Sequence, residues 1–295
     1  MKSFLMILCL AILTFAMIGV ANSIVVFEDN FDAENGGSYL LNYDTFANWS
    51  VSDGSVDLIG LGSPWDWFPS YGLFIDMDGS TSDAGKMTSK PIALVPNSTY
   101  TLTYDLAGNQ RMDQDDSVIV LVNGGSLVNN VHSIYWEKPF ATFSVTFNSG
   151  TATNAIISFE GTGNDNIGML LDNVKLEIVI LAVEIDIKPG SYPNSINLGS
   201  KGVIPVAIFS SQDFDATTVD PGTVQLAGSG VAVRGNKFMS HEEDVNGDGL
   251  MDLVVQVETE NLNPNTFQCG YAELTGTTYE GLSIVGWDEI RIVPK

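Results

Sequence analysis

Residues 99–106 read TYTLTYDL, an unbroken alternation of polar and apolar side chains. Successive side chains of a β-strand point to opposite faces of the sheet, so the pattern places Tyr100, Leu102, Tyr104 and Leu106 on one face. Such a strand turns its apolar face to a core and its polar face outward. This arrangement is typical of a strand in a β-sandwich.

Similar strand-like runs recur along the rest of the chain. Examples are SVIVLVN at 117–123, ATFSVTF at 141–147 and LMDLVVQVE at 250–258. Turn sequences such as Asp53-Gly54 and Asp78-Gly79 lie between the runs. No long amphipathic helical stretch interrupts them, and we therefore predict an all-β fold.

The length of 295 residues favours two domains. A second unit begins near Val183, where a strand leads into a Pro-, Gly- and Ser-rich turn region. The preceding stretch LEIVILAVEIDI, at 176–187, is nearly continuous strand and contains no flexible linker. We predict two β-sandwich domains, 24–180 and 184–295, joined by a stiff junction around residues 178–184.

The N-terminus has the features of a secretory signal peptide. Lys2 precedes an apolar run from Phe4 to Val20, and the small-residue triplet Ala21-Asn22-Ser23 follows it. We predict a signal peptide over 1–23, a secreted or cell-surface location, and no stable membrane insertion after cleavage. The alternative is a retained membrane anchor, because the apolar run approaches the length that spans a bilayer.

Charge and cysteine content limit the possible partners. The chain has 12 basic and 36 acidic residues. Loss of Lys2 with the signal peptide leaves a formal net charge of 11 − 36 = −25. Phosphate binding needs a basic patch and none is visible in the sequence, so nucleic acid is not expected as a partner. The acidity is compatible with binding of divalent cations. Removal of Cys9 leaves Cys269 without an intrachain disulfide partner, and we expect it to be a buried residue beside the strand 271–276.

The segment DVNGDGLMD, residues 244–252, has the composition of a calcium loop. Calcium takes six to eight oxygen ligands, and alternate side chains on a tight loop converge on one point. Gly249, at the sixth position, permits the sharp turn. The predicted ligands are the side chains of Asp244, Asn246, Asp248 and Asp252, with the backbone carbonyl of Leu250.

The residue at the twelfth position of this loop decides between two kinds of calcium site. A helix-loop-helix sensor needs a bidentate Glu there, but the position holds Val255 within a strand-like run. The sequence therefore indicates a strand-flanked structural site and not a calcium switch. The alternative is an Asp-, Asn- and Gly-rich hairpin turn without a metal.

A cluster of aromatic residues is the candidate ligand-binding surface. It lies in GSPWDWFPSYG, at 62–72, where two prolines indicate a loop. Aromatic faces stack on sugar rings while amide, carboxylate and guanidinium groups bond to the hydroxyls, so a glycan or polysaccharide is the expected partner. The alternative is that the aromatic residues pack against a core or the other domain. The candidate ligand-binding residues are Trp65, Trp67, Tyr71, Asn109, Arg111 and Asp113.

Catalytic residues are not predicted. His132 and His241 are the two histidines of the chain, and neither belongs to a nucleophile elbow or an HExxH motif. Paired carboxylates for glycoside cleavage are uninformative in a chain with 36 acidic residues.

Four stretches of the first domain together resemble a known family. NWSVSDGSVDLIG, FPSYGLFIDMDGSTSDAGKMTS, YTLTYDLAGNQR and NIGMLLDNVKLE are similar to the galactose-binding-like, carbohydrate-module jelly roll of bacterial exported proteins. The resemblance covers residues 24–180. It implies a structural calcium between Asp32, after the first strand, and Asp172, in the last; the alternative is that the two are separate surface acids.

The second domain contains IDIKPGSYPNSINLGSKGVIPVAIFSSQDFDATTVDPGTVQL, followed by EDVNGDGLMDLVVQV and AELTG. On these stretches residues 184–294 resemble a β-sandwich module of prokaryotic secreted and surface proteins, and the resemblance implies an immunoglobulin-like sandwich. Taken together, the sequence favours a secreted, non-catalytic, calcium- and carbohydrate-binding protein. One alternative is a structural surface or matrix subunit that assembles through contacts with other proteins. Another is an enzyme that acts on polysaccharides.

Overall fold

The computed structural model describes residues 21–81, 83–112, 114–163, 165–267 and 269–293. Within these ranges the regular structure is strand and short 3-10 turns, which confirms the predicted all-β class. The chain divides into two compact units, Ile24–Ile178 and Val179–Lys295. The predicted signal peptide lies almost wholly outside the described residues, and strand β1 begins at Ala21.

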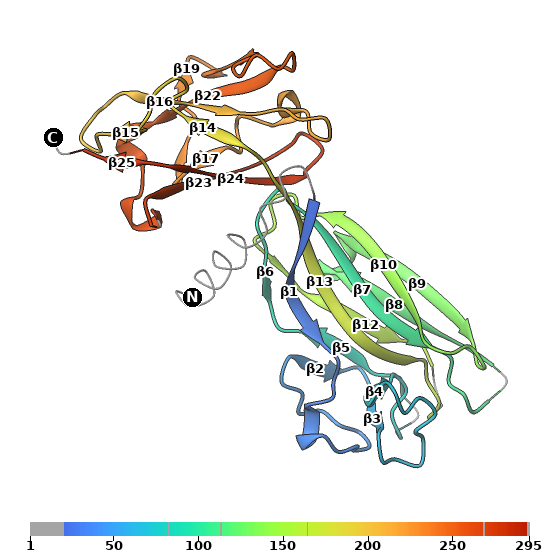
Figure 1. The fold of residues 1–295 in the computed structure, drawn as a ribbon. Coiled ribbons are helices and arrows are strands. Elements are labelled where there is room, and N and C mark those ends of the chain that lie inside the picture. The colour runs from blue at the N-terminus through green and yellow to red at the C-terminus, as the bar shows by residue number, and fades with distance from the viewer. Residues whose placement is uncertain (1–20, 82, 113, 164, 268, 294–295) are drawn as a thin grey trace. The chain divides into compact units, whose positions relative to one another are not determined.

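The N-terminal unit is a sandwich of two antiparallel sheets, which Figure 1 shows in blue to yellow-green. One layer follows the order β10-β7-β13, with β1 and β4 also paired to β13 and β3 paired to β4. The other follows the order β2-β5-β12-β8-β9. The first layer comprises β1 (Ala21–Asp29), β3 (Asp57–Gly60), β4 (Leu73–Asp76), β7 (Thr99–Ala107), β10 (Ala141–Asn148) and β13 (Leu170–Ala182). The second comprises β2 (Trp49–Ser52), β5 (Lys86–Ser89), β8 (Asp115–Val122), β9 (Val128–Tyr135) and β12 (Ile157–Gly161). Short elements complete the unit: β6 (Ile92–Ala93), β11 (Asn154–Ala155), η1 (Glu34–Gly36) and η2 (Asn123–Gly125).

The alternating segment 99–106 forms β7, and its apolar residues build the core as the pattern predicts. Tyr100, Leu102, Tyr104 and Leu106 are all at most 1 % exposed. The ring of Tyr104 meets that of Phe159 on β12 edge to face, with centroids 5.3 Å apart. This contact joins the two layers, so the inward face of β7 is buried and its outward face is left for polar residues.

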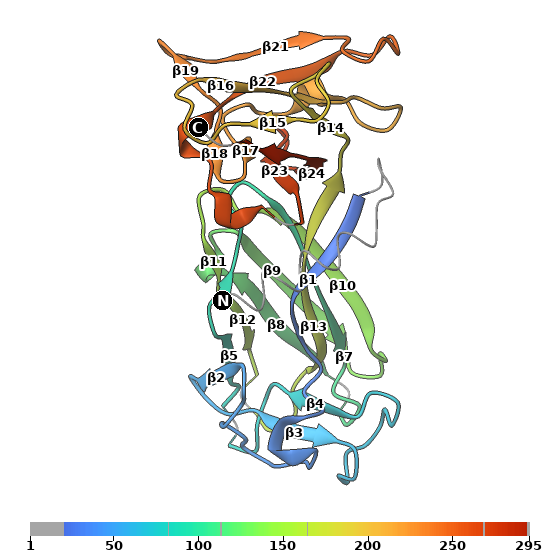
Figure 2. The ribbon, with the colours of Figure 1, turned by 60° about the vertical axis from the view of Figure 1, so that its left-hand side comes forward.

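The C-terminal unit is also built from two sheets, which Figure 2 shows one above the other. One layer contains β14 (Ile185–Ile187), β16 (Val203–Ile208), β22 (Asp252–Glu258) and β21 (Ser240–Glu243) in that order. The other contains β24 (Ser283–Glu289), β23 (Tyr271–Thr277), β17 (Gln225–Leu226) and β18 (Ser229–Gly230). The remaining elements are β15 (Ser195–Ile196), β19 (Val233–Arg234), β20 (Lys237–Phe238), β25 (Arg291–Ile292), η3 (Ala216–Thr218), η4 (Thr259–Asn261) and η5 (Pro264–Thr266).

Aliphatic residues from both layers fill the C-terminal core. Val206 on β16 and Val255 on β22 are fully buried, as are Leu226 and Leu274 from the facing sheet. Val255 is the residue at the twelfth position of the predicted calcium loop. Its apolar side chain is part of the core, so it provides no side-chain ligand for a cation.

The expectation that Cys269 is buried is wrong. Its thiol is free and exposed. Cys269 and Gly270 both have positive φ, +48° and +88°, so the chain turns sharply just before β23. A residue on such a turn points away from the sheet that follows it, and the strand's own apolar residues occupy the core instead.

Candidate functional site

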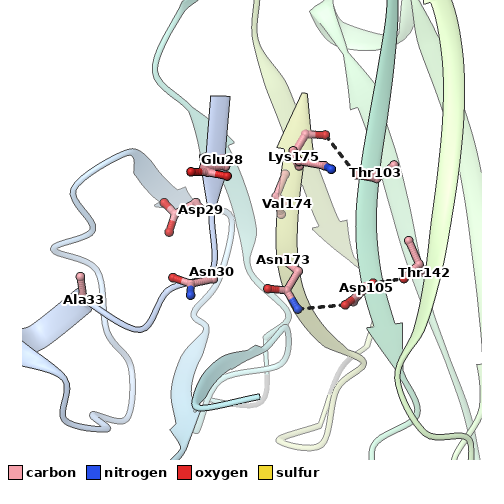
Figure 3. A pocket seen from close by; sticks show the side chains of 10 residues that line it. All are labelled: Glu28, Asp29, Asn30, Ala33, Thr103, Asp105, Thr142, Asn173, Val174 and Lys175. Carbon is pink, nitrogen blue, oxygen red and sulfur yellow. Dashed lines mark hydrogen bonds between the residues drawn. The ribbon is translucent and has the colours of Figure 1, made fainter. Parts of the chain in front are cut away.

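A polar groove lies on the outer face of the first layer of the N-terminal unit, with a volume of about 690 Å³ (Figure 3). Strands β1, β13, β7 and β10 supply its walls and floor. The alternation in β7 places Thr103 and Asp105 on this face, because Leu102 and Tyr104 point into the core. The lining residues are Glu28, Asp29, Asn30, Ala33, Thr103, Asp105, Thr142, Asn173, Val174 and Lys175.

A β-bulge in β13 shapes the centre of this groove. The pairing of β13 with β7 shifts register between Asp172 and Lys175, and Asn173 within the shift has a φ of +49°. A bulge inserts an extra residue and redirects side chains that a regular strand would place on alternate faces. Here the bulge shifts the register with β7 but keeps the alternation of faces, since Asp172 and Val174 are both buried while Asn173 is exposed toward the groove.

Asp105 is the centre of a hydrogen-bonded row across three strands. Its Oδ1 accepts a bond of 2.6 Å from the Thr142 hydroxyl on β10, and its Oδ2 accepts one of 2.9 Å from the Asn173 amide on β13 (Figure 3). The side chain is 8 % exposed. Two neutral donors therefore hold the carboxylate in a fixed orientation. The row presents hydroxyl, carboxylate and amide groups side by side, which is the chemistry that hydroxyl-rich ligands require.

Asp32 and Asp172, the pair that the family resemblance assigns to calcium, lie at one end of this region. Asp32 accepts bonds of 2.8 Å from the backbone N–H of Leu73 and from the Asn30 amide. Asp172 is fully buried, and its Oδ1 accepts a bond of 2.7 Å from the N–H of Asn173. Its Oδ2 is also buried and has no hydrogen-bond partner.

Burial, together with the negative charges of Asp32, Asp105 and Asp29, raises the pKa of Asp172 to about 8, although the hydrogen bond from the N–H of Asn173 opposes the shift. A buried carboxylate among other carboxylates is stable only when it is protonated or when a cation neutralises it. The orphaned oxygen and the surrounding charge therefore fit a hard cation ligated by Asp32 and Asp172.

The Asp244–Asp252 loop joins β21 to β22 at the edge of the C-terminal unit. It wraps around the Asp244 carboxylate, which accepts bonds of 2.8 Å from the N–H of Gly247 and 3.1 Å from those of Asp248 and Gly249. The Asn246 amide donates to Asp248 Oδ2 at 3.1 Å. The first, third, fifth and sixth positions of the loop are thus already gathered by its own hydrogen bonds.

Asp252, the ninth residue of the loop, faces the protein interior. It is fully buried, and its two oxygens accept bonds of 2.9 Å from the N–H groups of Ser210 and Val245. Asp244, Asp248 and Leu250 are exposed. Within the described ranges, no group of three or more His, Cys, Asp or Glu side chains is arranged to hold a metal. A cation at this loop would therefore need amide and backbone oxygens and water beside the carboxylates.

The aromatic residues of the 62–72 loop pack against the protein. Trp65, Trp67 and Tyr71 are half-buried against a buried cluster that includes Phe74. The ring of Tyr71 stacks on that of Phe140, with centroids 4.3 Å apart. This placement favours the packing alternative over a flat, open platform for a sugar ring.

Two of the polar ligand candidates are engaged within the protein. Asn109 is fully buried, and its amide donates to Asp116 Oδ2 at 2.7 Å. Arg111 forms an ion pair with the buried Asp76 and lies over the Trp67 ring at 5.7 Å. Asp113 lies outside the described residues. Asn109 and Arg111 are not among the residues that line the groove around Asp105.

Sequence reasoning also missed a group of buried carboxylates beside Arg111. Asp78 is 2 % exposed, and its Oδ2 has no hydrogen-bond partner. Burial, with the charges of Asp116 and Asp165, raises its pKa to about 7. Burial likewise raises the pKa of Asp116 to about 6, although the Asn109 amide opposes the shift. Asp78 lies in the loop after β4, Asp116 at the start of β8 and the half-buried Asp165 in the loop before β13, so only the folded chain brings them together.

No helix among the described residues has the length and apolar character needed to cross a membrane. No protein-family model matches the chain. No curated protein matches it either.

Several solved structures resemble part of the chain. The K3 cleaved adhesin domain of Lys-gingipain from Porphyromonas gingivalis is 15 % identical, with a TM-score of 0.36, and the match covers 53 % of this chain and 99 % of that domain. The C-terminal CBM6 module of a marine laminarinase from Zobellia galactanivorans is 15 % identical, with a TM-score of 0.30, over 53 % of this chain and 98 % of that module. A family 16 carbohydrate-binding module is 20 % identical, with a TM-score of 0.30, over 41 % of this chain and 84 % of that module. These are adhesin and carbohydrate-binding domains, the class that residues 24–180 resemble in sequence. At these TM-scores the likeness carries no information about the ligand of this chain.

Proposed function

We propose that the chain is an extracellular, non-catalytic, calcium-binding protein whose N-terminal unit binds a glycan in the groove around Asp105. The observation that carries the proposal is the hydrogen-bonded row of Thr142, Asp105 and Asn173 across the groove floor. Sugar hydroxyls both donate and accept hydrogen bonds, and a fixed row of such partners can orient them.

The charges at the groove favour a neutral or cationic sugar. Glu28, Asp29 and Asp105 line it, while Lys175 is the one basic residue of the lining set. The Lys175 ammonium is already paired with Glu177 at 3.0 Å. An anionic polysaccharide would meet net repulsion here, so uronate- or sulfate-rich polymers are disfavoured.

Calcium at Asp32 and Asp172 would stabilise the groove. Asp172 directly precedes Asn173 in the bulge, and Asp32 follows the groove residues of β1. A cation that joins the two carboxylates would hold β1 and the bulge at a fixed separation, and would thereby preorganise the binding surface.

Polysaccharide affinity electrophoresis and calorimetry on a panel of neutral and charged glycans test the proposal. Asn173→Gly removes the amide and keeps a residue suited to positive φ, and Thr142→Val removes the hydroxyl at similar volume. Together they should weaken binding by about tenfold or more. Thr146→Val, on β10 but away from the groove lining, is the matched control.

Three outcomes would contradict the proposal. Binding that survives the groove variants and disappears in Trp65→Ala with Trp67→Ala, at an unchanged melting temperature, would place the ligand at the aromatic loop. A lack of binding to every glycan would remove the carbohydrate function. Turnover of a glycan that one carboxylate substitution abolishes would make the chain an enzyme.

A further inference from the structure

Two adjacent strands form an open edge of the N-terminal sandwich. Among the described residues, β9 pairs only with β8 and ends one sheet, while β10 pairs only with β7 and ends the other. The rings of His132 on β9 and Phe143 on β10 lie 4.6 Å apart, so the two terminal strands are neighbours (Figure 1). No other strand among the described residues pairs with the outer edge of β9.

β9 has none of the features that usually prevent one sheet edge from pairing with another. It is eight residues long, and it pairs with β8 in continuous register from Val128 to Tyr135 without a bulge. It contains no Lys, Arg, Asp, Glu or Pro. Natural edge strands are usually short, bulged, charged or interrupted by Pro, because a long regular edge is a template for another strand.

The charge distribution indicates what this edge accepts. The chain has a net charge of −24, yet residues 117–159 contain only Glu137 and Lys138 as charged residues. This stretch includes β8 from Ser117 onward, β9, β10, β11 and the first three residues of β12, while Asp115 and Asp116 at the start of β8 precede it. Two copies of an acidic chain repel each other over most of their surface, and this stretch brings few carboxylates to a contact between them, with Asp115 and Glu137 near one end of β9. A strongly basic partner would gain nothing from a neutral surface.

The outward side chains of β9 suit such a contact. Val131 is 66 % exposed, and the small polar residues Asn129 and Ser133 flank it on the same face. The opposite edge of this sheet, β2, has only four residues. Burial of Val131 against a partner strand would add apolar contact to the backbone hydrogen bonds.

We propose that β9 is a self-association edge, at which the β9 strands of two copies of this chain pair in antiparallel orientation about a two-fold axis. The five-stranded sheet β2-β5-β12-β8-β9 then continues into that of the second copy. A two-fold contact uses the same surface on both copies, so it closes at a dimer. The groove around Asp105 lies on the other sheet, and the dimer is independent of the proposed glycan binding.

Sedimentation velocity of the full secreted chain, from low micromolar to several hundred micromolar, tests this contact. We expect a reversible monomer–dimer equilibrium. Val131→Lys and Val131→Glu should each raise the dimer Kd by about tenfold or more. In a two-fold contact the substituted side chains of both copies lie near each other, and their like charges repel. Ser50→Lys and Ser50→Glu introduce the same charges at the exposed opposite edge and should leave the Kd unchanged.

Hydrogen exchange on the unsubstituted chain gives a second readout that does not depend on variants. The amides of 128–135 should be more protected at high than at low protein concentration, while those of β2 should not change. A chain that stays monomeric throughout the concentration range would overturn the proposal. So would dimers that the Val131 and Ser50 variants affect equally, or protection gained only outside β9.

Discussion

Asp78 is a buried carboxylate whose folded environment opposes its charge. Its pKa of about 7 is above the ordinary value of 3.8, because burial and the nearby charges of Asp116 and Asp165 disfavour ionisation. Arg111 acts in the opposite direction but is engaged by Asp76. The folded state therefore binds more protons than the unfolded state between these two pKa values.

This difference predicts how the stability of the N-terminal unit depends on pH. The contribution of Asp78 is fully present below about pH 4 and is lost as the pH rises through about 7. In Asp78→Asn, the decline in the free energy of unfolding between pH 4 and pH 8 should be smaller by at least about 1 kcal/mol. Calorimetry in the presence of a chelator measures it. The exposed Asp115→Asn is the control, and an equal effect of both variants would contradict the prediction.

Asp172 gives a second prediction at the scale of one residue. Asn has nearly the shape of a protonated Asp, but it lacks the carboxylate that a cation requires. In the presence of a chelator, the free energy of unfolding of Asp172→Asn should lie within about 1 kcal/mol of that of the unsubstituted chain. Calcium should raise the melting temperature of the unsubstituted chain and that of the exposed control Asp44→Asn, but raise that of Asp172→Asn much less. Equal calcium shifts in all three proteins would exclude Asp172 as a ligand.

At the scale of elements, the β13 bulge explains how one strand serves two sites. A regular strand would place Asp172 and Val174 on one face and Asn173 on the other, but would keep all three in register with β7. The bulge breaks that register and holds Asn173 at positive φ, so its amide reaches Asp105 while Asp172 stays buried near Asp32. The groove and the proposed cation site are thus coupled through adjacent residues.

The β21–β22 hairpin carries the other proposed calcium site. Asp248 accepts a bond from the N–H of Leu250, and Asp248→Asn keeps an acceptor there while removing a charge. Calcium should slow hydrogen exchange in β21, β22 and the loop of the unsubstituted chain, because a bound cation stabilises the state that holds it. The Asp248→Asn variant should lose most of that protection, and the exposed control Asp213→Asn should keep it. Exchange that calcium leaves unchanged would mean that the loop is a hairpin turn without a metal.

At the scale of the whole molecule, the net charge of −24 opposes the compact state. Salt shortens the range of this repulsion from about 30 Å at 0.01 M to about 8 Å at 0.15 M. The melting temperature should therefore rise by several degrees as sodium chloride increases over this range at pH 7. At a pH near the isoelectric point of about 4.1 the same increase in salt should have little effect. A salt effect of equal size at both values would show that charge repulsion is not its cause.

Local sequence patterns were sufficient for the fold class. The alternation in 99–106 identified a half-buried strand, because apolar residues at every second position match the two-residue period of a strand with one buried face. The same period places Thr103 and Asp105 outward. For the ligand site, the local pattern pointed to Trp65 and Trp67 instead, since an aromatic loop is a stronger signal for sugar binding than a lone Asp in a strand.

The sequence by itself determined the all-β class, the outward face of β7 and the loop of alternating oxygens at 244–252, because each is a property of neighbouring residues. Only the tertiary structure decided that Trp65 and Trp67 pack inward, that Asp78, Asp116 and Asp165 meet, and that Asn173 reaches Asp105. These outcomes depend on register, on a bulge and on loops far apart in the chain. Burial and charge between distant residues are set when the strands pair, and no local pattern encodes them.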